Sequence, residues 1–136
     1  HIYEGKNGVR AIYNLVLENL KQGDEYFACQ VESEVFRGDF VEFIRDYHKQ
    51  RAKRGIKVKL LGSSESRQEM RKVMSGLKNM EMRFTEQPFP MAMLVFGDRV
   101  ATFVWGNETI GIVIRSRTIA DRYNKFFSSL WKNSKA

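Results

Sequence analysis

Residues 88–106 constrain the fold more than any other part of the chain, because two short apolar runs flank a tight-turn signal there. The runs at 91–96 and 100–105 are too short for independent helices and too apolar for surface strands. Gly97 and Asp98, which separate them, are typical of a two-residue hairpin turn. The sequence therefore predicts a central, buried β-hairpin.

The chain before this hairpin alternates between helix and strand. Apolar residues at helical spacing predict helices at 8–22, at 35–54 and at about 66–77, and alternating or β-branched runs predict strands at 25–31, 56–62 and 80–84. Gly55 stands where a left-handed helix cap belongs, and Ser66 with Glu69 forms a capping box for the third helix. Strands joined through helices favour a parallel sheet with right-handed crossovers.

The chain after the hairpin continues as a meander and closes with a helix. A strand at 110–114 follows a short turn, which predicts antiparallel pairing in this half of the sheet. The last helix is expected to begin at a capping box of Thr118 and Asp121. Its apolar stripe is assigned to core packing, with a subunit interface as the alternative, and contains Ile119, Tyr123, Phe126, Phe127, Leu130 and Trp131. The expected fold class is α/β, a mixed β-sheet flanked by helices, in one domain of 136 residues.

The hairpin resembles the motif-bearing hairpin of the phospholipase D superfamily. In those enzymes a nucleophilic His is followed two residues later by a Lys that supports the phosphate, and five residues after that by an Asp. The same spacing falls here on Met91, Met93 and Asp98, and Trp105 with Gly106 stands where the enzymes usually have Gly-Ser. A thioether can neither take a proton at neutral pH nor attack phosphorus usefully, so the resemblance implies a phospholipase D-like half without catalytic activity.

Both ends of the chain resemble archaeal transcriptional regulators of the TrmB type. The resemblance lies in the opening IYEGKNGVRAIYNLVLENL and the closing RSRTIADRYNKFFSSLWKN. It implies that residues 1–136 form a single phospholipase D-like domain that binds an effector such as a sugar and dimerises. DNA would be bound by a winged-helix domain upstream, and the start at His1 without an initiator Met fits an effector domain separated from that half. We expect a homodimer with a two-fold contact near the hairpin.

The candidate ligand-binding residues are Met91, Met93, Asp98, Trp105 and Cys29. Six methionines either surround an apolar pocket or fill the core: Met70, Met74, Met80, Met82, Met91 and Met93. Cys29 is the only cysteine, and its apolar surroundings predict a buried small hydrophobe, with a ligand role as the alternative. A lone cysteine fits a reducing compartment, which predicts a cytoplasmic protein.

The formal net charge of +7 permits a polyanionic partner without specifying one. The basic residues are densest at 45–59, where we expect a solvated helix end and an exposed strand face, with a DNA or partner contact as the alternative; they are Arg45, Lys49, Arg51, Lys53, Arg54, Lys57 and Lys59. No apolar run approaches the roughly 20 residues that cross a bilayer, so no membrane contact is expected.

Two other functional classes stay open. A divergent phosphodiesterase or nuclease would need a base or nucleophile near the hairpin, and His48 is the sole internal histidine. A protein-interaction module without a small ligand is the other class, because aromatic residues dominate interfaces as well as cores. Two histidines and one cysteine cannot supply a zinc site. Neither a metal nor a cofactor is expected.

Overall fold

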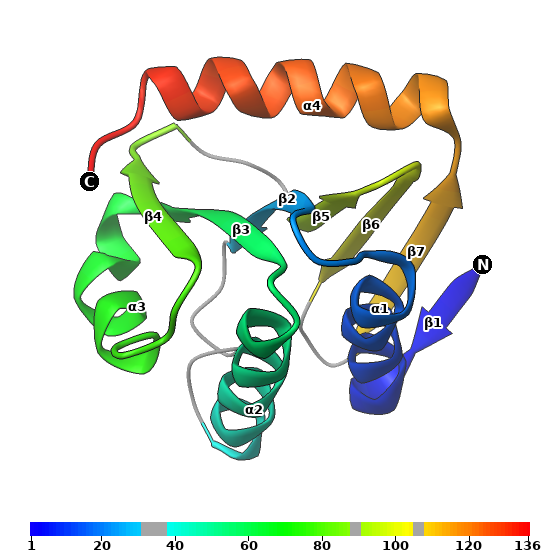
Figure 1. Cartoon of the computed structure of the whole chain (residues 1–136), viewed down its shortest axis with the longest axis horizontal. Helices are drawn as coiled ribbons and strands as arrows, with labels where there is room; N and C mark the ends of the chain where they lie inside the picture. Colours follow the sequence, from blue (N-terminus) through cyan, green and yellow to red (C-terminus); the bar gives the residue numbers. More distant parts are fainter. Residues whose placement is uncertain (31–37, 88–90, 105–107) are drawn as a thin grey trace.

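In the computed structural model, which describes residues 1–30, 38–87, 91–104 and 108–136, the strands form one mixed β-sheet in the order β1-β7-β6-β5-β2-β3-β4 (Figure 1). The strands are β1 (Ile2–Glu4), β2 (Glu25–Gln30), β3 (Lys57–Ser63), β4 (Met80–Thr85), β5 (Ala92–Phe96), β6 (Arg99–Val104) and β7 (Ile110–Arg115). The helices are α1 (Gly5–Asn19), α2 (Asp39–Lys53), α3 (Arg67–Val73) and α4 (Arg117–Lys132), with a 3-10 turn, η2 (Ser64–Ser66), before α3. The predicted α/β class is confirmed.

The sheet is parallel in one half and antiparallel in the other, as predicted. β2, β3 and β4 pair in parallel, whereas β5 runs antiparallel to β2 and begins the antiparallel half. The β5–β6 hairpin turns at Gly97, which has a positive φ of 58°. The favoured two-residue hairpin turns require a positive φ at their first residue. Strand β1 was not predicted, because three residues are too few for a period-two pattern, and only its antiparallel pairing with β7 defines it.

The predicted helices exist, with shifted boundaries. α1 begins at Gly5 and ends at Asn19, about three residues before the predicted bounds at each end. α2 begins at Asp39, while residues 31–37 of the predicted second helix lie outside the described chain. Gly55 follows α2 with a φ of 75°, which confirms the predicted left-handed cap.

Both capping-box predictions are wrong in detail. The Ser66 hydroxyl donates to the Ser63 carbonyl at 3.1 Å and caps no backbone N–H of α3. At α4 the N-cap is Ser116, whose Oγ accepts from the Ile119 backbone N–H at 3.2 Å, two residues before the predicted Thr118. The reason is tertiary: the Ser116 N–H donates to the Asp98 carbonyl in the hairpin turn, which holds Ser116 extended directly before the helix.

The two faces of the sheet carry different helices. α1, α2 and α3 lie on one face and α4 lies alone across the other (Figure 1). Because side chains alternate along a strand, β5 supplies Leu94 to the larger core and Met93 and Val95 to the core under α4. Lys59 was predicted to be solvated, but α4 covers this part of the face, and the Lys59 ammonium lies 5.6 Å from the centre of the Trp131 ring.

The end of the sheet beyond β6 presents exposed isoleucines on the face that carries α4. Gly111 of β7 lies against Ile12 of α1, and Val113 belongs to the larger core on that face. The residues that alternate with them along β7 therefore point to the opposite face. Ile2 pairs with Ile112 and shares that face. We call this set the isoleucine surface: Ile2, Ile110, Ile112 and Ile114, which are 67%, 39%, 42% and 44% exposed.

Candidate functional site

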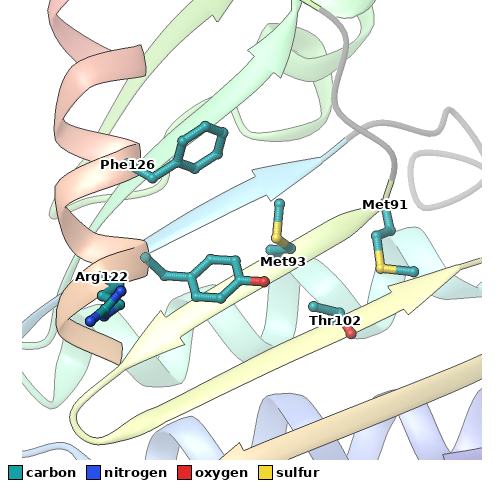
Figure 2. A pocket seen from close by; sticks show the side chains of 6 residues that line it. Met91, Met93, Thr102, Arg122 and Phe126 are labelled. Atoms are coloured by element: carbon teal, nitrogen blue, oxygen red, sulfur yellow. The ribbon is translucent and has the colours of Figure 1, made fainter. Parts of the chain in front are cut away.

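A cavity of about 400 Å³ lies between α4 and the β5–β6 hairpin (Figure 2). The described residues that line it come from the hairpin and from one side of the helix: Met91, Met93, Thr102, Arg122, Tyr123 and Phe126. The volume falls at the lower end of the roughly 300–1,000 Å³ found for small-ligand sites. We call this cavity the hairpin pocket.

Local periodicity brings these side chains together. Met93 and Thr102 are cross-strand partners in the hairpin, and both point to the face that carries α4. On α4, Tyr123 and Phe126 are three residues apart and therefore neighbours on the helix surface, with Arg122 beside them. Phe126 is 45% exposed, so the sheet does not cover the whole apolar stripe of α4.

The lining is mostly apolar and has one positive charge among its described residues. Two thioethers and a phenyl ring supply the apolar surface, and the hydroxyls of Thr102 and Tyr123 supply hydrogen-bonding groups. The Arg122 guanidinium has no hydrogen-bond or ion-pair partner in the part of the chain that the structure describes. The pocket thus offers, beside apolar surface, a cation that none of the described residues engages.

Two of the five predicted ligand residues, Met91 and Met93, line the hairpin pocket. Asp98 lies in the hairpin turn and is not among the described lining residues; its carboxylate accepts from Arg115 at 3.0 Å and pairs with Arg99 at 3.2 Å. The hydrogen bond from Arg115 lowers the pKa of that carboxyl group. Trp105 lies outside the described residues.

Cys29 is fully buried in the core under α4, where it pairs with Met93 across β2 and β5. Burial raises the pKa of its thiol above the ordinary value. The predicted buried small hydrophobe is therefore confirmed. Cys29 is not among the described residues that line the pocket.

Of the two alternatives for the six methionines, a pocket or the core, core packing holds for four. Met70 and Met74 are buried in the larger core on the opposite face of the sheet, and Met80 and Met82 pack against that core. Alternation along the strands and the position of α3 send these four side chains away from α4. Sequence reasoning missed four lining residues: Thr102, Arg122, Tyr123 and Phe126. The sequence assigns Tyr123 and Phe126 to the apolar stripe of the last helix instead. The only signal for Thr102 and Arg122 was their position on the faces that Met93 and Tyr123 also occupy.

The basic stretch at 45–59 is more internal than predicted. Arg51 is fully buried and donates to the carbonyls of Ile56, Lys78 and Asn79 at 2.6, 2.9 and 3.0 Å. Arg45 binds the carbonyls of Val73 and Ser75. Arg54 binds that of Leu17 at 3.0 Å. The expectation of a solvated helix end is therefore wrong for Arg51 in particular, because its guanidinium joins α2 to the chain entering β3 and β4.

His48 lies beside Arg51 on the face of the sheet opposite the hairpin pocket. It is 3% exposed, and its Nδ1 accepts from the Arg51 Nε at 3.0 Å. Burial, reinforced by the Arg51 charge, holds the pKa of His48 well below its ordinary value and keeps the imidazole neutral. The structure thus places the sole internal histidine away from the hairpin that a phosphodiesterase mechanism would need.

The described residues offer neither a metal-binding cluster nor a membrane-spanning helix. They hold no group of three or more His, Cys, Asp or Glu side chains placed to bind a metal ion. None of the described helices is long and apolar enough to span a bilayer.

Comparison with known proteins found one family and similar solved structures. The family model described as "Transcriptional regulator TrmB, EBD N-terminal subdomain", where EBD denotes the effector-binding domain, matches residues 29–136. The structure reported as "Structure of TrmBL2, an archaeal chromatin protein, shows a novel mode of DNA binding" superposes with a TM-score of 0.70 at 15% identity. The match covers 99% of this chain and 53% of that one, so the chain spans about half of this relative's length, and at this identity the likeness shows the fold alone. No curated protein sequence matches the chain.

Proposed function

The chain belongs to the TrmB family of transcriptional regulators, as the N-terminal subdomain of their effector-binding domain, and on this premise we propose that it senses a small molecule without catalysing a reaction. The observation that carries the proposal is the hairpin pocket. It is concave, largely apolar and furnished with a few polar groups, as small-molecule sites usually are.

The chemistry of the lining supports a binding role over a catalytic one. The described lining residues include no histidine, carboxylate or thiol, which are the usual bases and nucleophiles. Met91 and Met93, which occupy the nucleophile and phosphate-binding positions of the phospholipase D spacing, both line the pocket. This arrangement supports the interpretation of a phospholipase D-like scaffold whose former reaction site now holds a ligand.

DNA binding is proposed for a winged-helix domain upstream of this chain, and action on DNA would place the protein in the cytoplasm. The basic stretch gives little support for DNA contact by this domain itself, because Arg45, Arg51 and Arg54 bind backbone carbonyls within the fold. TrmBL2 is described as binding DNA, but the chain spans only about half of it.

The effector function is tested by thermal shift against a library of sugars, nucleotides, amino acids and organic acids. A compound at a hundredfold excess over its Kd raises the free energy of unfolding by about 2.7 kcal/mol. Thr102→Phe fills the pocket and should abolish the shift, whereas Ile114→Phe changes an exposed residue outside the pocket lining and should leave it intact. A shift that survives Thr102→Phe would place the effector elsewhere, and a library with no hit would argue for an interaction module.

Dimerisation is proposed through the isoleucine surface, with a second copy of the chain as the partner. Four exposed isoleucines form an apolar patch on neighbouring antiparallel strands, and an isologous contact would cover both patches at once. Light scattering should then give a dimer that Ile112→Glu converts to a monomer, while Lys125→Glu on the exposed side of α4 does not. A monomeric wild-type domain would instead assign this surface to another part of the full-length regulator.

A further inference from the structure

The cation of the hairpin pocket indicates the charge of its ligand. Arg122 lines the pocket, its side chain is exposed, and it has no partner within the described residues. Its guanidinium differs in this respect from those of Arg45, Arg51 and Arg54, which are all bound to backbone carbonyls. A planar guanidinium binds a carboxylate through two parallel hydrogen bonds, so the free fork of Arg122 is complementary to that group.

The remaining lining indicates the body of the ligand. Met91, Met93 and Phe126 present polarizable and aromatic surface, which favours contact with an aromatic ring or a branched alkyl chain. Figure 2 shows the Met93 and Phe126 side chains reaching the pocket from the strand and the helix, so a flat apolar group would lie between them.

The polar groups of the described pocket lining argue against two other classes of ligand, sugars and phosphates. A sugar presents many hydroxyls that need paired donors and acceptors, yet the described lining has no Asp, Glu, Asn or Gln and only two hydroxyls. A phosphate carries up to two charges, and Arg122 is the one cation among the described lining residues. A single negative charge on an apolar body matches the lining better than either.

We propose that the hairpin pocket binds a small apolar carboxylate, an aromatic or branched-chain organic acid, with its carboxylate on Arg122 and its body against Met91, Met93 and Phe126. This inference rests on the proposed function, since it names the chemical class of the effector at the same site. The hydroxyls of Thr102 and Tyr123 are available to the second lone pairs of the carboxylate.

The experiment uses the 136-residue domain with ¹³C-methyl-labelled methionine. The probes are 3-phenylpropionate, phenylacetate, isovalerate and indole-3-acetate, each beside its uncharged carboxamide, with maltose as the sugar. Binding should shift the methyl resonances of Met91 and Met93 and leave those of Met70 and Met74, which are buried on the opposite face, in place. Calorimetry then gives the Kd of each compound that binds.

At least one acid should bind about tenfold more tightly than its carboxamide, because a charge-assisted bond is replaced by a neutral one. Arg122→Gln should weaken that acid about tenfold and weaken the carboxamide by much less, because a glutamine amide can still donate a neutral hydrogen bond. Unchanged methyl resonances of Met70 and Met74 show that the variant is folded. Lys125→Gln removes the same charge from an α4 residue outside the described lining and should change the acid's Kd less than twofold.

Three results would overturn the carboxylate proposal: equal affinity for acid and carboxamide, an unchanged Kd in Arg122→Gln, or no acid that moves the Met91 and Met93 methyls. If maltose or another neutral metabolite moves those methyls, the proposed function stands and only the ligand class is wrong. If no compound in the metabolite library moves them, the proposed function is lost as well.

Discussion

Arg51 should be a determinant of folding and not of DNA affinity, and Arg51→Met tests which of the two it is. Its guanidinium is fully buried and donates to the carbonyls of Ile56, Lys78 and Asn79. The Asn79 carbonyl also accepts from the Val58 N–H at 3.0 Å and keeps that partner in the variant. The Lys78 carbonyl belongs to an exposed residue. The loss of partners therefore falls on two buried acceptors: the Ile56 carbonyl, and His48 Nδ1, which accepts from the Arg51 Nε at 3.0 Å.

A buried polar group left without a partner costs about 1–3 kcal/mol, so two of them cost about 2–6 kcal/mol. This is a large part of the roughly 5–15 kcal/mol by which small domains are stable. With a urea m-value of about 1–3 kcal/mol per M, the unfolding midpoint should fall by about 1–3 M. Arg51→Lys should recover only part of the loss, because an ammonium cannot reproduce the planar fork.

The assay is urea unfolding followed by circular dichroism, with Lys53→Met as the matched control. Lys53 is two residues away on the same helix and exposed, so its removal should change the free energy of unfolding by less than about 0.5 kcal/mol. A loss below about 1 kcal/mol in Arg51→Met would refute the structural assignment. A well-folded Arg51→Met protein whose full-length form had lost DNA affinity would favour the alternative of a basic contact surface.

Three further predictions follow from groups whose environment the structure defines. Because the pKa of His48 is depressed in the fold, only the unfolded state protonates this imidazole near neutrality, so the free energy of unfolding should fall by about 1 kcal/mol as pH drops from about 6.5 to 5.5. In urea melts, His48→Gln should show a smaller fall, and an equal dependence on pH in both proteins would contradict the assignment. Ser116→Ala should lower the free energy of unfolding by about 1 kcal/mol in the same melts, because it removes the observed N-cap of α4. Thr118→Ala should lower it clearly less, and the reverse order would favour the predicted capping box. The buried Cys29 thiol, whose pKa is raised, should resist iodoacetamide in the folded domain and react on unfolding, as followed by mass spectrometry; rapid labelling of the native protein would contradict its burial.

The basic stretch shows where sequence reasoning fails and why. A run of lysines and arginines looks the same whether its members point to water or to the interior. Arg51 is buried because the chain brings the carbonyls of Ile56, Lys78 and Asn79 to one point, and two of these lie more than 25 residues away in sequence. No local pattern encodes that convergence, so the solvated interpretation was reasonable for the stretch and wrong for this residue.

The hairpin pocket was partly predictable. The phospholipase D spacing picked out Met91 and Met93, and both line the cavity. Met93 points from β5 to the face that carries α4, and Met91 lies directly before β5. The same spacing selected Asp98, but the turn holds that carboxylate in ion pairs with Arg99 and Arg115. Arg122 carried no signal, since an arginine on an amphipathic helix is ordinarily a solvated residue.

The order of elements, the turn at Gly97 and the mixed sheet were determined by the sequence alone, because periodicity, turn residues and connection lengths are local properties. The tertiary structure decided which face each helix covers, how strand β1 pairs and where the sheet stays bare. Alternation marks two faces of a strand as different without saying what will cover either. That choice depends on where α4 crosses the sheet, and its crossing both encloses the hairpin pocket and leaves the isoleucine surface exposed.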